Sequence, residues 1–536
     1  MSDEAKKENA PDHALGRRNL MKLGAGAVLS TLAASSASAQ FEEPLRGPAP
    51  APGSMRGPND IRPHTGPGYK NDANRLHGNG PMDDTSREIV EWVHKYNASD
   101  VTETVAKAFN RTMVDSMASL VAGFEEDPCR IATRMARYYP AGELKSTILG
   151  YGVSTSPEIA TFANGCLIRM VDFNDNGDGG HVSTLIPAAM ALGEALNCTG
   201  EEVMAAIIIG YEIAGAPAGG ESVTAAMVAG KLMKLDQDRL ANALTIALTP
   251  HVALNKGVGA LSMWKSVRSA ESAKCGVWAA MLAKEGMTGP PQPFEGKGGL
   301  WSMRGSGEGG GGNAGGGGRA GRPFTLPVKP NQMAIERNWF KRRPSEASSQ
   351  GLIEIMPQIR AWVKPDEVAA IQYDTSYGIW DEICDAPKWD PRNRETADHS
   401  LPYIVARALI EGDIYMDSFD EAKYMDPAAH ALMDKMTFGP VPNWQGLGVG
   451  RISITKKSGE SKTWDTYNGA RVLGEKEYPH LTDAELTAKF NRACAFKKMD
   501  NSQRDQAYKM WGNLRAVNKF TDAMNVLAKF GQPQPL

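Results

Sequence analysis

The sequence predicts a mainly α-helical protein, with a large all-helical domain followed by a smaller α+β domain. Residues 83–325 carry apolar residues at helical spacing, with helix-start signals in front of several segments. After Asn338, β-branched and aromatic residues alternate with polar ones in two stretches, as they do in half-buried strands. The length of 536 residues is enough for two domains with extensions at both ends.

Capping signals define helices in the first domain. Thr85 and Glu88 have the spacing of a capping box, and Thr199 and Glu202 have the same spacing. The segment after Thr199 is rich in Ala, Met and Ile and contains few charges. A helix of this composition is expected to be buried among other helices.

Residues 326–479 are expected to form an α+β lid domain. Two stretches in it read as strands, EVAAIQYDTSY and RISITKKSGESKTW, and Ser458-Gly459 in the second is predicted to form a hairpin turn. Helical sequence lies between the two stretches. Residues 480–536 return to helix and are expected to pack back on the helical domain.

The N-terminus resembles an export signal. Arg17 and Arg18 precede a weakly apolar stretch at 23–34, and residues 37–39 form an Ala-Ser-Ala cleavage site. Residues 1–39 are therefore predicted to be a twin-arginine signal peptide, read by the twin-arginine export machinery. This predicts a periplasmic protein that crosses the membrane already folded.

Two segments lack any helical period. Residues 40–82 are rich in Pro and Gly and are predicted to be a linker or an arm. Residues 304–322 form a Gly-rich insertion in the helical domain. A phosphate-binding loop is not expected there, because no buried strand precedes the glycines and no Gly-Lys-Ser/Thr follows them.

Composition excludes several classes of protein. A formal net charge of −3 gives no reason to expect nucleic acid or an anionic membrane as a partner. No apolar run reaches the roughly 18 residues that a membrane span needs, so stable membrane insertion is not expected. The six cysteines are scattered without a CxxC pair, which is typical of single buried thiols rather than of a zinc or iron–sulfur site.

The stretch MVDFNDNGDGGHVS, residues 170–183, is similar to a calcium-binding loop. If the loop began at Asp172, its bidentate carboxylate would fall at Ser183, and Gly180 would occupy the ninth position. Such a calcium site would be weak. A simple Asn/Asp/Gly turn or a substrate-binding loop are the alternatives.

Five blocks in order carry a resemblance to a known family: RMVDFNDNGDGGHVSTLIPAAMALGEAL, AAIIIGYEIAG, GALSMWKSVRSAESAKCGVWAAMLAKEGMTGP, NWFKRRPSEASSQ and ADHSLPYIVARALIEG. Together they resemble the MmgE/PrpD family, which includes 2-methylcitrate dehydratase and cis-aconitate decarboxylase. The resemblance implies a large helical domain, a smaller α+β lid, a homodimer, and neither a metal nor an organic cofactor.

The resemblance also implies the chemistry and its residues. Substrates are small di- or tricarboxylic acids, so the site needs groups that bind carboxylates and groups that transfer protons. His181 is similar to the family's active-site histidine, and Asp172 is expected to orient it or a substrate hydroxyl. Lys265 and Lys341 match two lysines of the family that face the substrate.

Further residues are expected to bind the substrate. Tyr403 matches a family tyrosine at the edge of the site, with a core aromatic as the alternative. Arg268 could supply a second carboxylate contact, and Asn176 and His251 are additional candidates. His399 is expected to fix the turn in which it lies rather than to take part in the chemistry.

Two departures from the family bear on the reaction. GYEIAGAPAGGES lacks a histidine that some relatives carry, and Glu346 stands where decarboxylating relatives have a histidine. Both argue against cis-aconitate decarboxylation. The expected activity is therefore that of an exported hydro-lyase acting on a 2-methylcitrate-like acid. The alternatives are an epimerase or isomerase of a related polycarboxylate and a non-catalytic periplasmic binder of organic acids.

Overall fold

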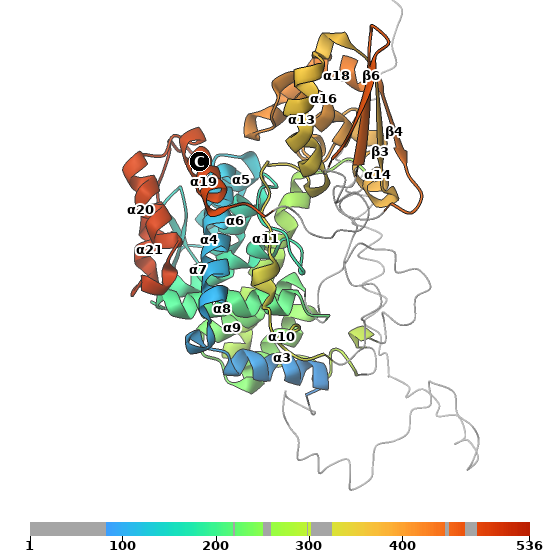
Figure 1. Ribbon diagram of the computed structural model, residues 1–536. Helices are drawn as coiled ribbons and strands as arrows, with labels where there is room; N and C mark the ends of the chain where they lie inside the picture. The colour runs from blue at the N-terminus through green and yellow to red at the C-terminus, as the bar shows by residue number, and fades with distance from the viewer. Residues whose placement is uncertain are drawn as a thin grey trace, which may run out of the picture. The chain divides into compact units, whose positions relative to one another are not determined.

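The computed structural model describes residues 82–217, 220–249, 259–296, 299–301, 324–444, 450–466 and 480–536. The predicted signal peptide at 1–39, all but the last residue of the predicted arm at 40–82, and the Gly-rich insertion at 304–322 lie outside the described residues. Figure 1 draws them as a thin grey trace.

Helices make up most of the first part of the chain, which confirms the predicted fold class (Figure 1). A short antiparallel pair, β1 (Ser146–Ile148) and β2 (Val153–Thr155), interrupts them. The helices are α3 (Asp84–Lys95), α4 (Glu103–Gly123), α5 (Asp127–Arg134), α6 (Pro157–Arg169), α7 (Ile186–Ala195), α8 (Gly200–Ala214), α9 (Glu221–Leu232), α10 (Gln237–Leu248) and α11 (Met263–Lys284).

One of the two predicted capping boxes is confirmed. At the start of α8, Thr199 Oγ1 accepts from the backbone N–H of Glu202 at 3.2 Å. The Glu202 carboxylate accepts in return from the Thr199 N–H at 2.9 Å. The helix behind this cap is almost entirely buried, as its composition predicts.

The predicted cap at Thr85 is wrong, because α3 begins at Asp84 with Asp83 as its N-cap. Asp83 Oδ1 accepts from the Ser86 N–H at 3.0 Å. Its Oδ2 accepts from the backbone N–H groups of Phe294 and Glu295 at 2.8 and 3.2 Å. The buried Asp83 thus accepts hydrogen bonds from a distant segment as well as from its own helix. The local sequence does not reveal this second contact.

Helix α11 packs against α6 and α9 in the centre of the helical part. The α6–α11 contact depends on Gly165, where an added Cβ would lie 2.6 Å from the Cβ of Ala270. Such a distance is too short for two carbon atoms, so only glycine allows the two helices to approach this closely. The end of α6 and the start of α11 both carry residues of the candidate site.

The α+β part contains a four-stranded sheet in the order β4-β3-β5-β6. β3 runs parallel to β4 and antiparallel to β5, and β5 pairs antiparallel with β6. The predicted hairpin turn between β5 and β6 is confirmed, and Gly459 in it has a φ of +89°. The strands are β3 (Val368–Thr375), β4 (Met436–Pro440), β5 (Gly450–Lys456) and β6 (Ser461–Asp465).

Helices cover one face of this sheet (Figure 1). Ile371 and Tyr373 of β3 and Ile452 and Ile454 of β5 are buried in one apolar cluster with side chains of these helices. Burial alternates along β5, as expected for a sheet packed on one side. The covering helices are α13 (Gln350–Trp362), α16 (Leu401–Glu411) and α18 (Pro427–Met433).

Three helices end the chain: α19 (Asp483–Phe496), α20 (Asn501–Trp511) and α21 (Phe520–Leu527). α19 packs against α4, and α21 packs against α7. Both partners belong to the helical part. Within the described residues, no helix is both long enough and apolar enough to cross a membrane. All six cysteines are unpaired thiols, and five of them are buried.

Asp83→Ala should cost far more stability than a simple cap deletion. It leaves the buried N–H groups of Ser86 and Phe294 and the part-buried N–H of Glu295 without their acceptor, so we expect a loss of about 3 kcal/mol in the free energy of unfolding. Thr199→Ala removes a single exposed cap and should cost about 1 kcal/mol. Urea denaturation of both variants measures the difference. Equal losses would show that Asp83 acts only within its own helix.

Candidate active site

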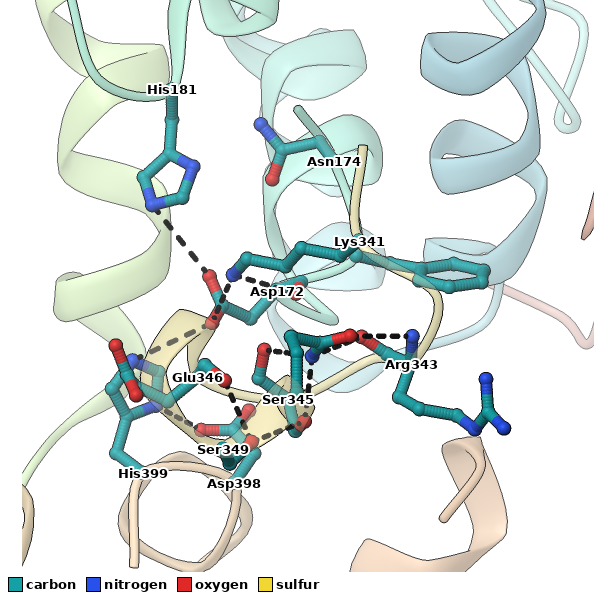
Figure 2. Close-up of polar contacts among 12 residues, drawn as sticks. Asp172, Asn174, His181, Lys341, Arg343, Ser345, Glu346, Ser349, Asp398 and His399 are labelled. Carbon is teal, nitrogen blue, oxygen red and sulfur yellow. Dashed lines mark hydrogen bonds and ion pairs between the residues drawn. The ribbon is translucent and has the colours of Figure 1, made fainter. Parts of the chain in front are cut away.

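A buried carboxylate, that of Asp172, lies at the centre of the candidate site (Figure 2). The residue follows the end of α6 and has a φ of +48°, a left-handed conformation that aspartate tolerates better than most residues. Arg169, the last residue of α6, donates to its Oδ1. Lys341 Nζ donates to its Oδ2 at 2.7 Å and to its carbonyl oxygen at 3.0 Å.

The two cations keep Asp172 ionised. Burial alone would raise the pKa of Asp172, but the positive charges of Arg169 and Lys341 outweigh it and hold the pKa well below its usual range. Burial in turn lowers the pKa of Lys341, although Asp172 opposes this effect. The result is a fixed negative charge enclosed by fixed positive charges.

His181 lies beside this carboxylate as a neutral imidazole. Its Nδ1 is 2.7 Å from the backbone carbonyl of Asp175, which only accepts, so Nδ1 carries the proton. Its Nε2 is 4.0 Å from Asp172 Oδ1. Burial lowers the pKa of His181 well below its usual value, and Arg169 and Lys341 lower it further. The free lone pair on Nε2 therefore makes His181 suited to accept a proton.

On another side of Asp172, Lys265 and His399 form a hydrogen-bonded pair. Lys265 Nζ contacts His399 Nε2, and His399 Nδ1 contacts the carboxylate of Asp398. His399 Nε2 is also 3.7 Å from Asp172 Oδ2. Burial lowers the pKa of Lys265 to about 8. An amine with this pKa can donate or accept a proton near neutral pH.

Glu346 adds a further titratable group to the cluster (Figure 2). Its backbone N–H donates to the carbonyl of Asp398 at 3.0 Å, and its side chain accepts from the Ser348 N–H at 2.6 Å. Burial raises the pKa of Glu346 to about 7, in spite of the opposing charge of Lys341. Near neutral pH this carboxyl group is therefore partly protonated.

A buried network holds the loop that carries Asp172 and His181. Asp175 Oδ2 accepts from the hydroxyl of Tyr211 at 2.6 Å and from Asn338 Nδ2 at 2.7 Å, and its Oδ1 accepts from the Ser183 N–H. The cations at Asp172 occupy the oxygens that a calcium ion would need at the first position of such a loop. Among the residues that the structure describes, no group of three or more His, Cys, Asp or Glu could hold a metal ion.

A backbone bridge joins the same loop to the segment that carries Lys341. The Asn176 N–H donates to the Trp339 carbonyl at 2.9 Å, and the Trp339 N–H donates to the Asn176 carbonyl at 2.8 Å. This pairing brings Lys341 to Asp172 although the two residues are far apart in the sequence. The substrate-binding role of the Asn176 side chain stays a prediction.

Two family models match the chain: the MmgE/PrpD N-terminal domain over residues 87–309 and the MmgE/PrpD C-terminal domain over residues 344–511. The chain belongs to the MmgE/PrpD family. Of the four residues predicted to be catalytic, Asp172, His181 and Lys265 lie within the first matched region, and Lys341 lies between the two regions. The C-terminal model extends past the sheet into α19 and α20.

Several relatives whose names contain cis-aconitate decarboxylase are similar in sequence to most of this MmgE/PrpD chain. The cis-aconitate decarboxylase-like protein oryM of Aspergillus oryzae is 23% identical over 460 residues, which are 77% of this chain and 91% of that protein. The cis-aconitate decarboxylase of Homo sapiens is 23% identical over 415 residues, 70% of this chain and 82% of that protein. The Mus musculus protein of the same name is also 23% identical, over 416 residues.

The structure brings together Asp172, His181, Lys265 and Lys341, the four residues predicted to be catalytic. The predicted substrate-binding residues gain less support. Arg268 is ion-paired with Glu221 at 2.9 Å. Tyr403 is fully buried in the apolar cluster behind the sheet, and its hydroxyl donates to the Ser418 carbonyl. Its substrate-binding role thus stays a prediction that its contacts do not favour. His251 lies outside the described residues.

Sequence reasoning missed three members of the cluster, namely Arg169, Asp398 and His399. His399 was expected only to fix its turn, but its Nε2 contacts Lys265 and lies near Asp172. The sequence feature that could have identified His399 is the Asp-His pair in DHSLPY, in which Asp398 is placed to orient the imidazole ring. Arg169 could have been found from its position three residues before Asp172, at the end of a helix.

Asp172→Asn should destabilise the MmgE/PrpD fold strongly. It leaves two buried cations facing a neutral amide, which costs about 3–5 kcal/mol. Asp84→Asn breaks an exposed pair with Arg87 at the same i,i+3 spacing and should cost at most about 1 kcal/mol. Chemical denaturation at pH 7 compares the two. A loss below about 1 kcal/mol for Asp172→Asn would rule out the proposed charge balance.

The neutral state of His181 predicts a pH dependence of stability. Below about pH 6.5 an unfolded histidine takes up a proton that the folded protein excludes, so stability falls as the pH drops through that range. His181→Gln removes this contribution. We expect the stability difference between wild type and variant to shrink from pH 7 to pH 5, as measured by denaturation at each pH. A constant difference would mean that the pKa of His181 is the same in the folded and the unfolded protein.

Proposed function

We propose that this protein is a lyase acting on a small di- or tricarboxylic acid, with its own side chains as the acid and the base. One observation carries the proposal. A neutral histidine, His181, and a hydrogen-bonded amine–imidazole pair, Lys265 with His399, lie around the same buried carboxylate of Asp172. A proton acceptor and a proton donor are thus placed around one point, which acid–base chemistry requires.

The charge of the cluster supports an acidic substrate. Arg169, Lys265 and Lys341 contribute three basic groups, all of them buried. Asp172 balances part of that charge, and Glu346 is partly neutral near pH 7 because burial raises its pKa to about 7. A bound carboxylate would compensate the remaining positive charge in a region where burial strengthens electrostatic attraction.

Dehydration is the reaction that we propose first. His181 Nε2 removes the hydrogen on the carbon next to a substrate carboxylate, and the electron pair moves into that carboxylate. Nearby cations stabilise the developing negative charge. Lys265, with its pKa of about 8, then protonates the departing hydroxyl, and a water molecule leaves as the carbon–carbon double bond forms.

Decarboxylation is the second candidate, and the names of the curated relatives favour it. In that reaction the bond between carbon and a carboxylate breaks, carbon dioxide leaves, and an amine such as Lys265 supplies a proton to the carbon. The family resemblance places Glu346 where decarboxylating members are expected to have a histidine, and this difference favours dehydration. Proton removal without loss of a group would instead give an epimerase.

Assays with 2-methylcitrate, citrate and cis-aconitate separate these reactions. Loss of hydroxyl, release of carbon dioxide and exchange of the carbon-bound hydrogen for deuterium are followed in parallel. His181→Gln and Lys265→Met should lower kcat by about 10²–10⁴-fold, because each removes one proton-transfer step. Lys274→Met, which breaks an ion pair with Glu271 on the same helix as Lys265, should leave kcat within about twofold.

The outcome of these assays decides between an enzyme and a binder. If the acids raise the melting temperature but no hydrogen exchanges and no product forms, the protein is a binder of organic acids. If both active-site variants retain the wild-type kcat, the proposed acid and base are wrong even though the protein is an enzyme.

A further inference from the structure

Lys489 lies on α19, the first of the three C-terminal helices, and its side chain reaches the back of the candidate site. Its side chain is buried, and its Nζ donates to three acceptors. These are Asp115 Oδ1 on α4 at 2.5 Å, the carbonyl of Phe173 at 2.7 Å and the carbonyl of Lys341 at 2.9 Å. An ammonium group has three protons, so each acceptor uses one of them.

The two carbonyls belong to the segments that carry the central ion pair. Phe173 is the next residue after Asp172, and Lys341 is the partner of Asp172 itself. One nitrogen therefore holds both backbones within hydrogen-bond distance at the point where their side chains meet. Since its three protons are used in this way, Lys489 does not contact a substrate.

We propose that Lys489 is a positioning residue, which fixes the backbone of the Asp172 loop against the backbone of Lys341 and thereby sets the geometry of the cluster. The proposal rests on the proposed function only in that the cluster is taken to be the active site. We call the two hydrogen bonds from Lys489 to the carbonyls of Phe173 and Lys341 the clamp. Its effect on the two backbone segments can be measured without any substrate.

The surroundings explain why a cation can occupy this place. The carboxylate of Asp115 faces Lys489, and Lys489 Nζ lies 3.8 Å from the centre of the Phe173 ring. A buried ammonium is costly unless a counter-charge and hydrogen-bond acceptors compensate it. Here α4 supplies the counter-charge, the two site segments supply the carbonyls, and an aromatic face adds an electrostatic contact.

The alternative is that Lys489 only anchors α19 to the helical part through Asp115. Lys497, the residue after the end of α19, provides a matched control. It is also largely buried, and its Nζ pairs with Glu126 at 3.0 Å, but no hydrogen bond described for it reaches the site segments. Both lysines tie the same helix to the same body, and only Lys489 bonds to the Asp172 and Lys341 segments.

Amide hydrogen exchange, read by mass spectrometry, tests the clamp directly. The N–H groups of Asn176 and Trp339 pair the two segments and serve as reporters. Lys489→Met should speed exchange of both reporter peptides at least tenfold, whereas Lys497→Met should change it less than twofold. Both variants should lower the melting temperature. In turnover of the acids, Lys489→Met should reduce kcat at least tenfold and leave KM within about threefold.

Each outcome decides a different question. If both lysine variants exchange alike at the two reporters, Lys489 is an anchor of α19 and the clamp is wrong. If only Lys489→Met loosens the reporters but wild-type protein turns over none of the acids, the clamp stands and the proposed function fails. Should Lys489→Met not fold, Lys489→Gln, which keeps a hydrogen-bond donor without the charge, is held to the same comparison.

Discussion

Everything in the candidate site depends on burying the carboxylate of Asp172. A carboxylate removed from water must be compensated, and here Arg169 and Lys341 do so from two different segments. Those cations, once buried, depend on the carboxylate in the same way. Burial keeps His181 neutral by lowering its pKa, and the positive charges of Arg169 and Lys341 lower that pKa further. The charges of Asp172, Arg169 and Lys341 are therefore coupled, because removing any one of them leaves another buried charge without its counter-charge.

The charged cluster also joins the helical part of the fold to the α+β part. α6 ends at Arg169, α11 starts just before Lys265, and the turn before α16 holds His399 (Figure 1). Lys265 reaches across to His399, so a helix of the first part and a turn of the α+β part meet through side chains. The sheet contributes no residue to the cluster. It packs against α16, the helix that follows the turn with His399.

Sequence patterns identified the fold class, the hairpin and the cap at Thr199 because each depends on neighbouring residues. The cap at Thr85 failed because Asp83 also serves a segment distant in the sequence. His399 was assigned to a turn for a related reason. Its neighbours in the chain explain the turn, while Lys265, its partner, comes from another part of the molecule. Proximity across the fold can be inferred from sequence only where a family resemblance supplies it, as it did for Lys341.

The position of Lys489 near the end of the chain has a consequence for biosynthesis. A ribosome that has released residues up to His399 has already delivered every member of the charged cluster, but not the helix that braces it from behind. The hydrogen bonds from Lys489 to the carbonyls of Phe173 and Lys341 therefore form only when translation is nearly complete.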